Sequence, residues 1–118
     1  MRSICLFPLA MLCLASPAFA HAFLEHASPP VGSELPVSPS AVTITYTEGV
    51  EPDFSTIEVD DAHGTRVDKA DPHLFGGEQT KLSVSLPKLP AGQYTVIWHV
   101  TSVDTHKTEG RFNFSVTP

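Results

Sequence analysis

The sequence predicts an all-β domain in which two antiparallel sheets pack face to face. Two observations support this fold class. Apolar and polar residues alternate along several short runs, as they do in strands with one buried face. Turn signals rich in Pro and Gly separate these runs, and no long stretch carries a convincing helical stripe of apolar residues. Short strands joined by frequent turns are typical of a β-sandwich.

The expected strands follow one another along a single domain, without an internal repeat or a linker. A first strand is expected around residues 23–27, and clearer alternating runs lie at 42–46, 57–59, 82–86, 94–100 and 112–116. In the run 42–46, for example, Val42, Ile44 and Tyr46 share one face. The stretch 60–78 is the least patterned, so it is expected to hold loops and a short edge strand.

Aromatic residues are expected to supply much of the core. A sandwich of this size buries a thin layer of side chains, so a few large rings fill a substantial part of it. Five such rings lie in the alternating runs, and packing is their expected role: Tyr46, Tyr94, Trp98, Phe112 and Phe114.

The first 20 residues have the three parts of a cleavable export signal. Arg2 gives a positive start, residues 4–15 form an apolar run, and Ala18-Phe19-Ala20 fits the small-x-small cleavage pattern. The apolar run is too short to span a membrane, and no second run of about 18 residues follows. We therefore expect a signal peptide at 1–20, a mature domain at 21–118 and a periplasmic location. The alternative is an uncleaved N-terminal anchor.

Cleavage after Ala20 would remove every sulfur atom from the protein. Both cysteines and both methionines lie within residues 1–20, whereas all six histidines lie within 21–118. The mature domain would form no disulfide and would offer no thiolate or thioether ligand of the kind that favours Cu(I). It would also carry thirteen Asp and Glu against six Lys and Arg, which argues against nucleic acid as a partner.

Two features place histidines where they could bind a metal ion. His21 would be the first residue of the exported protein, where its α-amine and ring nitrogen can chelate one ion. Asp104-Thr105-His106 follows the strongest predicted strand and is therefore expected in a loop or strand end. If the segment is extended, its Asp and His point to the same side. Nitrogen and oxygen donors of this kind suit Cu(II). No nucleophile motif or phosphate-binding glycine loop is evident, so an enzyme is not expected.

The order of these features resembles the CopC family, and more closely its YobA-like members. His21 is followed by an aromatic-x-Glu segment at 46–52 and by the stretch 92–110, which contains Y-x-V-x-W and S-x-D-x-H. The likeness covers nearly all of residues 21–118. It implies a seven-stranded Greek-key sandwich of cupredoxin-like or immunoglobulin-like appearance, and a periplasmic protein of copper resistance or homeostasis.

The resemblance also implies a ligand set for one Cu(II) ion per chain. His21 would bind through its amine and imidazole, and Asp104 and His106 would supply the remaining donors. Glu48 matches a family glutamate that acts as a near or outer ligand. A separate CopD-like inner-membrane protein would be the partner. The methionine-rich Cu(I) loop of some CopC proteins is not expected here, because residues 21–118 contain no methionine.

Two other functions fit parts of this pattern. An N-terminal histidine with a second histidine also resembles the histidine brace of lytic polysaccharide monooxygenases, which would make the protein a copper-dependent oxidative enzyme. A metal-free immunoglobulin-like interaction module is the other alternative. The other four histidines are not expected to bind the ion directly: His26, His63, His73 and His99. His26 or His99 could be a partner outside the ligand set.

Overall fold

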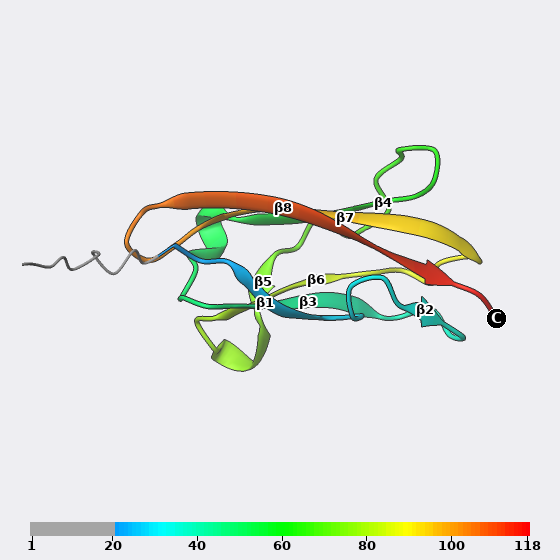
Figure 1. The fold of residues 1–118 in the computed structure, drawn as a ribbon, viewed down its shortest axis with the longest axis horizontal. Coiled ribbons are helices and arrows are strands. Elements are labelled where there is room, and N and C mark those ends of the chain that lie inside the picture. Colours follow the sequence, from blue (N-terminus) through cyan, green and yellow to red (C-terminus); the bar gives the residue numbers. More distant parts are fainter. Residues whose placement is uncertain (1–20) are drawn as a thin grey trace, which may run out of the picture.

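The computed structural model describes residues 21–118, which form a two-layered β-structure (Figure 1). The predicted signal peptide at 1–20 lies outside these residues. The described chain contains two 3₁₀ turns, η1 (Pro52–Phe54) and η2 (Phe75–Gly77). Its eight strands are β1 (Leu24–Ser28), β2 (Glu34–Leu35), β3 (Ala41–Tyr46), β4 (Thr56–Asp60), β5 (His73–Leu74), β6 (Lys81–Ser85), β7 (Gly92–Thr101) and β8 (Lys107–Val116). Across residues 21–118, no helix is long and apolar enough to cross a bilayer.

The strands form two four-stranded sheets, which confirms the predicted sandwich. One sheet has the order β1-β3-β6-β5 and the other has the order β2-β8-β7-β4. The neighbouring strands pair antiparallel, except that the short β2 runs parallel to the end of β8. The chain crosses between the sheets several times, so strands that are neighbours in a sheet are often distant in sequence.

Most strand boundaries agree with the alternation in the sequence, but β8 begins earlier than the pattern indicates. The expected strand 112–116 is the second half of a strand that starts at Lys107 and pairs with β7 throughout. The first half lacks apolar alternation because the residue opposite Trp98 is Gly110. A Cβ atom on Gly110 would lie 2.5 Å from Cζ2 of Trp98, so the indole occupies the space of a side chain. The short edge strand expected within 60–78 is β5.

The core lies between the two sheets, and all five predicted aromatic residues are buried in it. Tyr46 and Trp98 meet edge to face with ring centroids 5.3 Å apart. Tyr94 and Phe114 stack at 5.4 Å. The first contact joins the two sheets, the second joins the neighbouring strands β7 and β8 of one sheet, and both match the geometries that aromatic pairs prefer.

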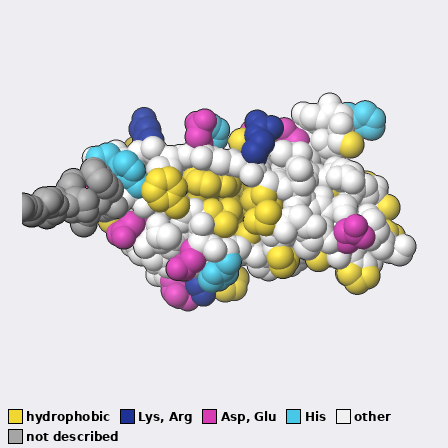
Figure 2. All heavy atoms as spheres, viewed as in Figure 1, with side chains coloured by type: hydrophobic (Ala, Val, Ile, Leu, Met, Phe, Trp, Pro, Cys, Tyr) yellow, Lys and Arg dark blue, Asp and Glu magenta, His cyan; other side chains and the backbone are white. Residues whose placement is uncertain are grey.

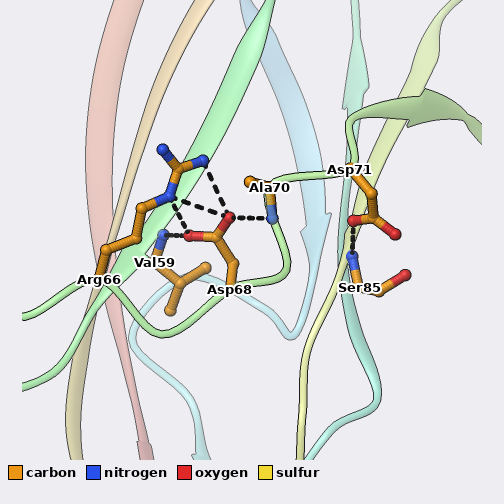
Figure 3. A network of polar contacts seen from close by, with 6 residues as sticks. All are labelled: Val59, Arg66, Asp68, Ala70, Asp71 and Ser85. Atoms are coloured by element: carbon orange, nitrogen blue, oxygen red, sulfur yellow. Dashed lines mark hydrogen bonds and ion pairs between the residues drawn. The ribbon is translucent and has the colours of Figure 1, made fainter.

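Carboxylates hold the irregular connection between β4 and β5 against both sheets (Figure 3). Asp68 accepts hydrogen bonds from the backbone of Val59 in β4, from the backbone of Ala70 and from the Arg66 guanidinium. Asp71 accepts a hydrogen bond from the backbone of Ser85 in β6. Side-chain acceptors therefore order the unpatterned stretch together with backbone hydrogen bonds, such as those from Val67 to Val59 and from Lys69 to Ser85.

The described chain begins at the end of the sandwich where β7 turns into β8, and the C-terminus lies at the opposite end (Figure 1). Figure 2 shows histidine side chains at the same end, beside the start of the described residues. This arrangement brings the N-terminal segment 21–23 next to the turn that carries Asp104 and His106.

Candidate metal centre

The D-x-H triplet lies in the tight turn between β7 and β8, which agrees with the loop or strand end expected for it, although the chain is not extended there. The backbone N–H of Thr105 donates to the carbonyl of Ser102 at 2.8 Å, and the N–H of Ser102 donates to the carbonyl of His106 at 2.8 Å. Thr105 has a φ of 75°, a left-handed conformation that is unusual for a β-branched residue. Asp104 and His106 approach each other because the chain turns between them.

A buried serine organises this turn. Ser102 has no exposed surface, and its hydroxyl is in contact with the carboxylate of Asp104 and the backbone of His106. The second carboxylate oxygen of Asp104 lies 3.1 Å from Nδ1 of His106. The Ser102 hydroxyl, and after it the contacts with His106, hold the pKa of Asp104 below its ordinary value. Asp104 is therefore a charged acceptor aimed at one nitrogen of His106.

The second histidine of the candidate site comes from the start of the described chain. The ring of His21 lies 4.5 Å from the ring of His106, measured between centroids, with an angle of 53° between the planes. The same ring lies 5.9 Å from that of Phe23, a half-exposed residue at the rim. Because Nδ1 of His106 faces Asp104, its Nε2 is the ring nitrogen left for an ion.

Two threonines hold the N-terminal segment in this position. The hydroxyl of Thr47, directly after β3, accepts from the N–H of Phe23 at 3.0 Å and donates to the carbonyl of His21 at 3.2 Å. The hydroxyl of Thr108 in β8 donates to the carbonyl of Ala22. The segment is thus bonded to both sheets at once. No local pattern in the sequence indicates these contacts, since isolated threonines are common in strands.

Glu48 lies between Thr47, which contacts the N-terminal segment, and Gly49, which contacts the turn between β7 and β8. Its neighbour Thr47 contacts the N-terminal segment, and the carbonyl of its other neighbour Gly49 accepts from the N–H of Val103 at 3.0 Å. Gly49 packs so closely here that a Cβ atom would lie 3.2 Å from Cγ1 of Val103. The half-buried Glu48 therefore lies beside both the segment of His21 and the turn of His106.

The remaining histidines have other surroundings. His99 is exposed on the outer face of its sheet, with Nδ1 3.2 Å from a carboxylate oxygen of Glu109. His26 is exposed on β1, opposite Thr45. The other two belong to the connection around β5 and its preceding turn: His63, which is exposed, and His73, whose Nδ1 contacts the carbonyl of Asp71.

The side-chain atoms that lie together here are nitrogens and oxygens, donors that suit several divalent metals, Cu(II) among them. They do not form a complete cage of side chains, because the structure groups no three His, Cys, Asp or Glu residues within 21–118 in a way that could hold one ion. His21 and His106 approach as a pair, and Asp104 is turned toward His106. A further donor would therefore have to come from outside these side chains. The backbone nitrogen of His21 belongs to the same residue as one of the two rings.

Comparisons with known proteins agree with this architecture. The CopC domain model matches residues 24–117, a range that begins after His21 and includes Glu48, Asp104 and His106. Protein YobA of Escherichia coli (strain K12) is 37% identical over 99 residues, which cover 83% of this chain and 80% of that protein. Copper transport protein CutJ of Bacillus subtilis (strain 168) is 34% identical over 109 residues, which cover 92% of this chain and 20% of that longer protein.

Solved structures share the fold. CopC from Methylosinus trichosporium OB3b superposes with a TM-score of 0.78 and 34% identity, covering 83% of this chain and 95% of that one. PcoC, a methionine-rich copper resistance protein from Escherichia coli, superposes with a TM-score of 0.74 and 25% identity, covering 83% of this chain and all of that one. With a family model matched along nearly all of its described length, this chain belongs to the CopC domain family.

Proposed function

We propose that this protein binds one Cu(II) ion through His21 and His106, with Asp104 as a ligand or as the partner that orients His106, and that it carries or sequesters copper in the periplasm. The observation that supports this most directly is the 4.5 Å separation of the His21 and His106 rings. The names of two relatives point the same way, since one is a copper transport protein and the other a copper resistance protein. The donors are nitrogen and oxygen, which suits Cu(II) better than Cu(I).

Each residue has a distinct role in this proposal. His106 supplies Nε2, and His21 supplies its ring nitrogen together with its α-amine. Asp104 orients His106 by accepting at Nδ1, an arrangement common among histidine ligands of metals. Of the two roles open to Asp104, ligand or orienting partner, the contact with Nδ1 favours the second. Glu48 acts from outside the ligand set, since it lies beside both the N-terminal segment and the turn.

The α-amine takes part only if the chain is cut between Ala20 and His21. We therefore include the signal peptide at 1–20 and the mature domain at 21–118 in the proposal. Before cleavage the nitrogen of His21 belongs to a peptide bond and is a poor metal donor. Cleavage would then complete a site whose two imidazoles are already close. Delivery to or from a separate CopD-like membrane protein is part of the same proposal.

The first test asks whether the α-amine of His21 is a donor to copper. The protein starting at His21 is prepared beside a variant with one alanine added before His21, and a control with one alanine added after Pro118. Mass spectrometry verifies each N-terminus, and competition with a chelator of known affinity gives the Cu(II) dissociation constant. We expect one Cu(II) per chain and a loss of about tenfold or more for the N-terminal addition alone. Equal affinities in all three proteins would contradict the amine as a donor.

A copper-dependent oxidative enzyme is the second candidate, because two facing imidazoles with an N-terminal amine would also form a histidine brace. The two functions differ in what copper does after binding. Incubation of the copper-loaded protein with a reductant, oxygen and polysaccharide would release oxidised sugars from an enzyme. A carrier releases none and gives up its copper intact to a stronger chelator.

A further inference from the structure

The N-terminal segment is clamped by hydroxyl groups from both sheets. Thr47 follows β3 in one sheet, and its hydroxyl bonds to the backbone of His21 and of Phe23. Thr108 lies in β8 of the other sheet, and its hydroxyl bonds to the carbonyl of Ala22. Each of the three residues in segment 21–23 therefore has a backbone group held by a threonine.

Burial of Ala22 makes this clamp specific. Ala22 has no exposed surface and belongs to the core, although His21 and Phe23 on either side reach the solvent. A buried carbonyl costs free energy unless a donor reaches it, and Thr108 provides that donor. The side chain of Ala22 fixes how deep the segment lies, while the two threonines fix its direction.

The clamp also links the two halves of the candidate metal centre. Thr108 is two residues after His106, at the start of β8, so the chain that leaves the turn of one imidazole also holds the segment that carries the other. Thr47 is the neighbour of Glu48 and holds the same segment from the opposite sheet. A shift of the segment relative to β8 would separate His21 from His106.

We propose that Thr47 and Thr108 are positioning residues for copper: they hold the backbone of residues 21–23 so that His21 meets His106 before the ion binds. The inference rests on the proposed function. Neither threonine touches the ion in this scheme. They reduce the conformational entropy that is lost when copper binds, because a ligand that is already held in place loses less freedom on binding.

The test uses the protein that starts at His21 and four variants. Thr108→Val and Thr47→Val remove one hydroxyl each at nearly constant shape, and Thr108→Ser retains the hydroxyl. Thr95→Val is the matched control, because the Thr95 hydroxyl bonds to Asn113 in the same sheet but away from residues 21–23. For each protein we measure Cu(II) affinity by chelator competition, the Cu(II) electron paramagnetic resonance spectrum and the melting temperature without metal.

We expect Thr108→Val and Thr47→Val each to weaken Cu(II) binding by about threefold to tenfold and to change or broaden the resonance spectrum. Thr108→Ser should stay within about twofold of the parent, and Thr95→Val should retain its affinity and spectrum even if its melting temperature falls.

The outcomes separate this inference from the function on which it rests. If the parent binds Cu(II) tightly and both valine variants bind it equally well with the same spectrum, the positioning role is wrong and copper binding stands. If Thr95→Val weakens binding as much as Thr108→Val does, the effect is general stability and the positioning role is again overturned. If the parent takes up no stoichiometric Cu(II), both proposals fail together.

Discussion

At the scale of single residues, the candidate site depends on a chain of contacts through Ser102, Asp104 and His106. The buried Ser102 hydroxyl holds one carboxylate oxygen of Asp104, and the other oxygen faces Nδ1 of His106. Such partners fix both the tautomer and the orientation of a histidine ligand. The sequence motif S-x-D-x-H thus describes one connected unit, in which the serine is as much a part of the geometry as the two residues predicted as ligands.

Asp104→Asn should weaken Cu(II) binding by about tenfold to a hundredfold, because the amide is a poorer acceptor for Nδ1–H of His106. Glu109→Gln is the matched control: it changes a similar carboxylate–imidazole pair at His99 on the outer face of the sheet. Isothermal titration with a competing chelator would measure both. Equal effects of the two substitutions would show that overall charge, and not the orientation of His106, controls affinity.

At the scale of elements, β7 and β8 form the arm that carries the turn, and their pairing depends on one glycine. Gly110 lies opposite Trp98, whose indole fills the place of a side chain. Alternation of apolar residues predicted the second half of β8 from the sequence. The first half could not be predicted this way, because its inward positions are Thr108 and Gly110 and its outward positions are charged.

Gly110→Ala should destabilise the fold by about 1–3 kcal/mol, since the new Cβ would overlap the buried indole and force it to move. Arg111→Ala, an exposed change at the next position of the same strand, should alter the free energy of unfolding by less than about 0.5 kcal/mol. Urea unfolding followed by tryptophan fluorescence measures both. A Gly110→Ala protein as stable as the parent would show that Trp98 has room to shift.

The connection between β4 and β5 should make stability depend on acid pH through Asp68. Burial alone would raise the pKa of this carboxyl, but the hydrogen bonds from Arg66, Val59 and Ala70 outweigh burial and lower it. The pKa of Asp68 in the folded protein is thus below its value of about 3.9 in the unfolded chain. The ionised carboxylate therefore stabilises the fold above about pH 3.9, and this stabilisation is lost as the pH falls through the pKa of the folded state. Asp68→Asn should therefore cost about 1–3 kcal/mol at neutral pH and progressively less below about pH 4. A difference in unfolding free energy that stays constant down to strongly acid pH would contradict this role.

At the scale of the whole molecule, the candidate site joins the two sheets at one end of the sandwich. Thr47 follows β3 of one sheet, whereas Thr108 lies in β8 of the other and His106 lies in the turn just before β8. An ion bound between His21 and His106 would act as an added link across this end. Binding should therefore stabilise the folded protein as a whole, not the turn alone.

Cu(II) should raise the melting temperature of the protein that starts at His21. With free ion at one hundred times the dissociation constant, a single site adds about 2.7 kcal/mol to the free energy of unfolding. His106→Ala should remove most of this increase, and a chelator should reverse it in the parent. Differential scanning calorimetry would measure the shift. An equal increase in His106→Ala would place the stabilising copper somewhere other than the proposed site.

The fold class, most strands and the aromatic core could be predicted from the sequence alone, and the sequence also singled out His21, Asp104 and His106 as candidate site residues. These inferences depend on patterns that are local in the chain, such as alternation along a strand or the spacing within S-x-D-x-H. Only the folded chain shows that His21 meets His106, that Asp104 faces Nδ1, and that Thr47 and Thr108 hold the N-terminal segment. The physical reason is that these contacts join residues from different strands and both sheets. Their geometry exists only after the two sheets have packed around Tyr46 and Trp98.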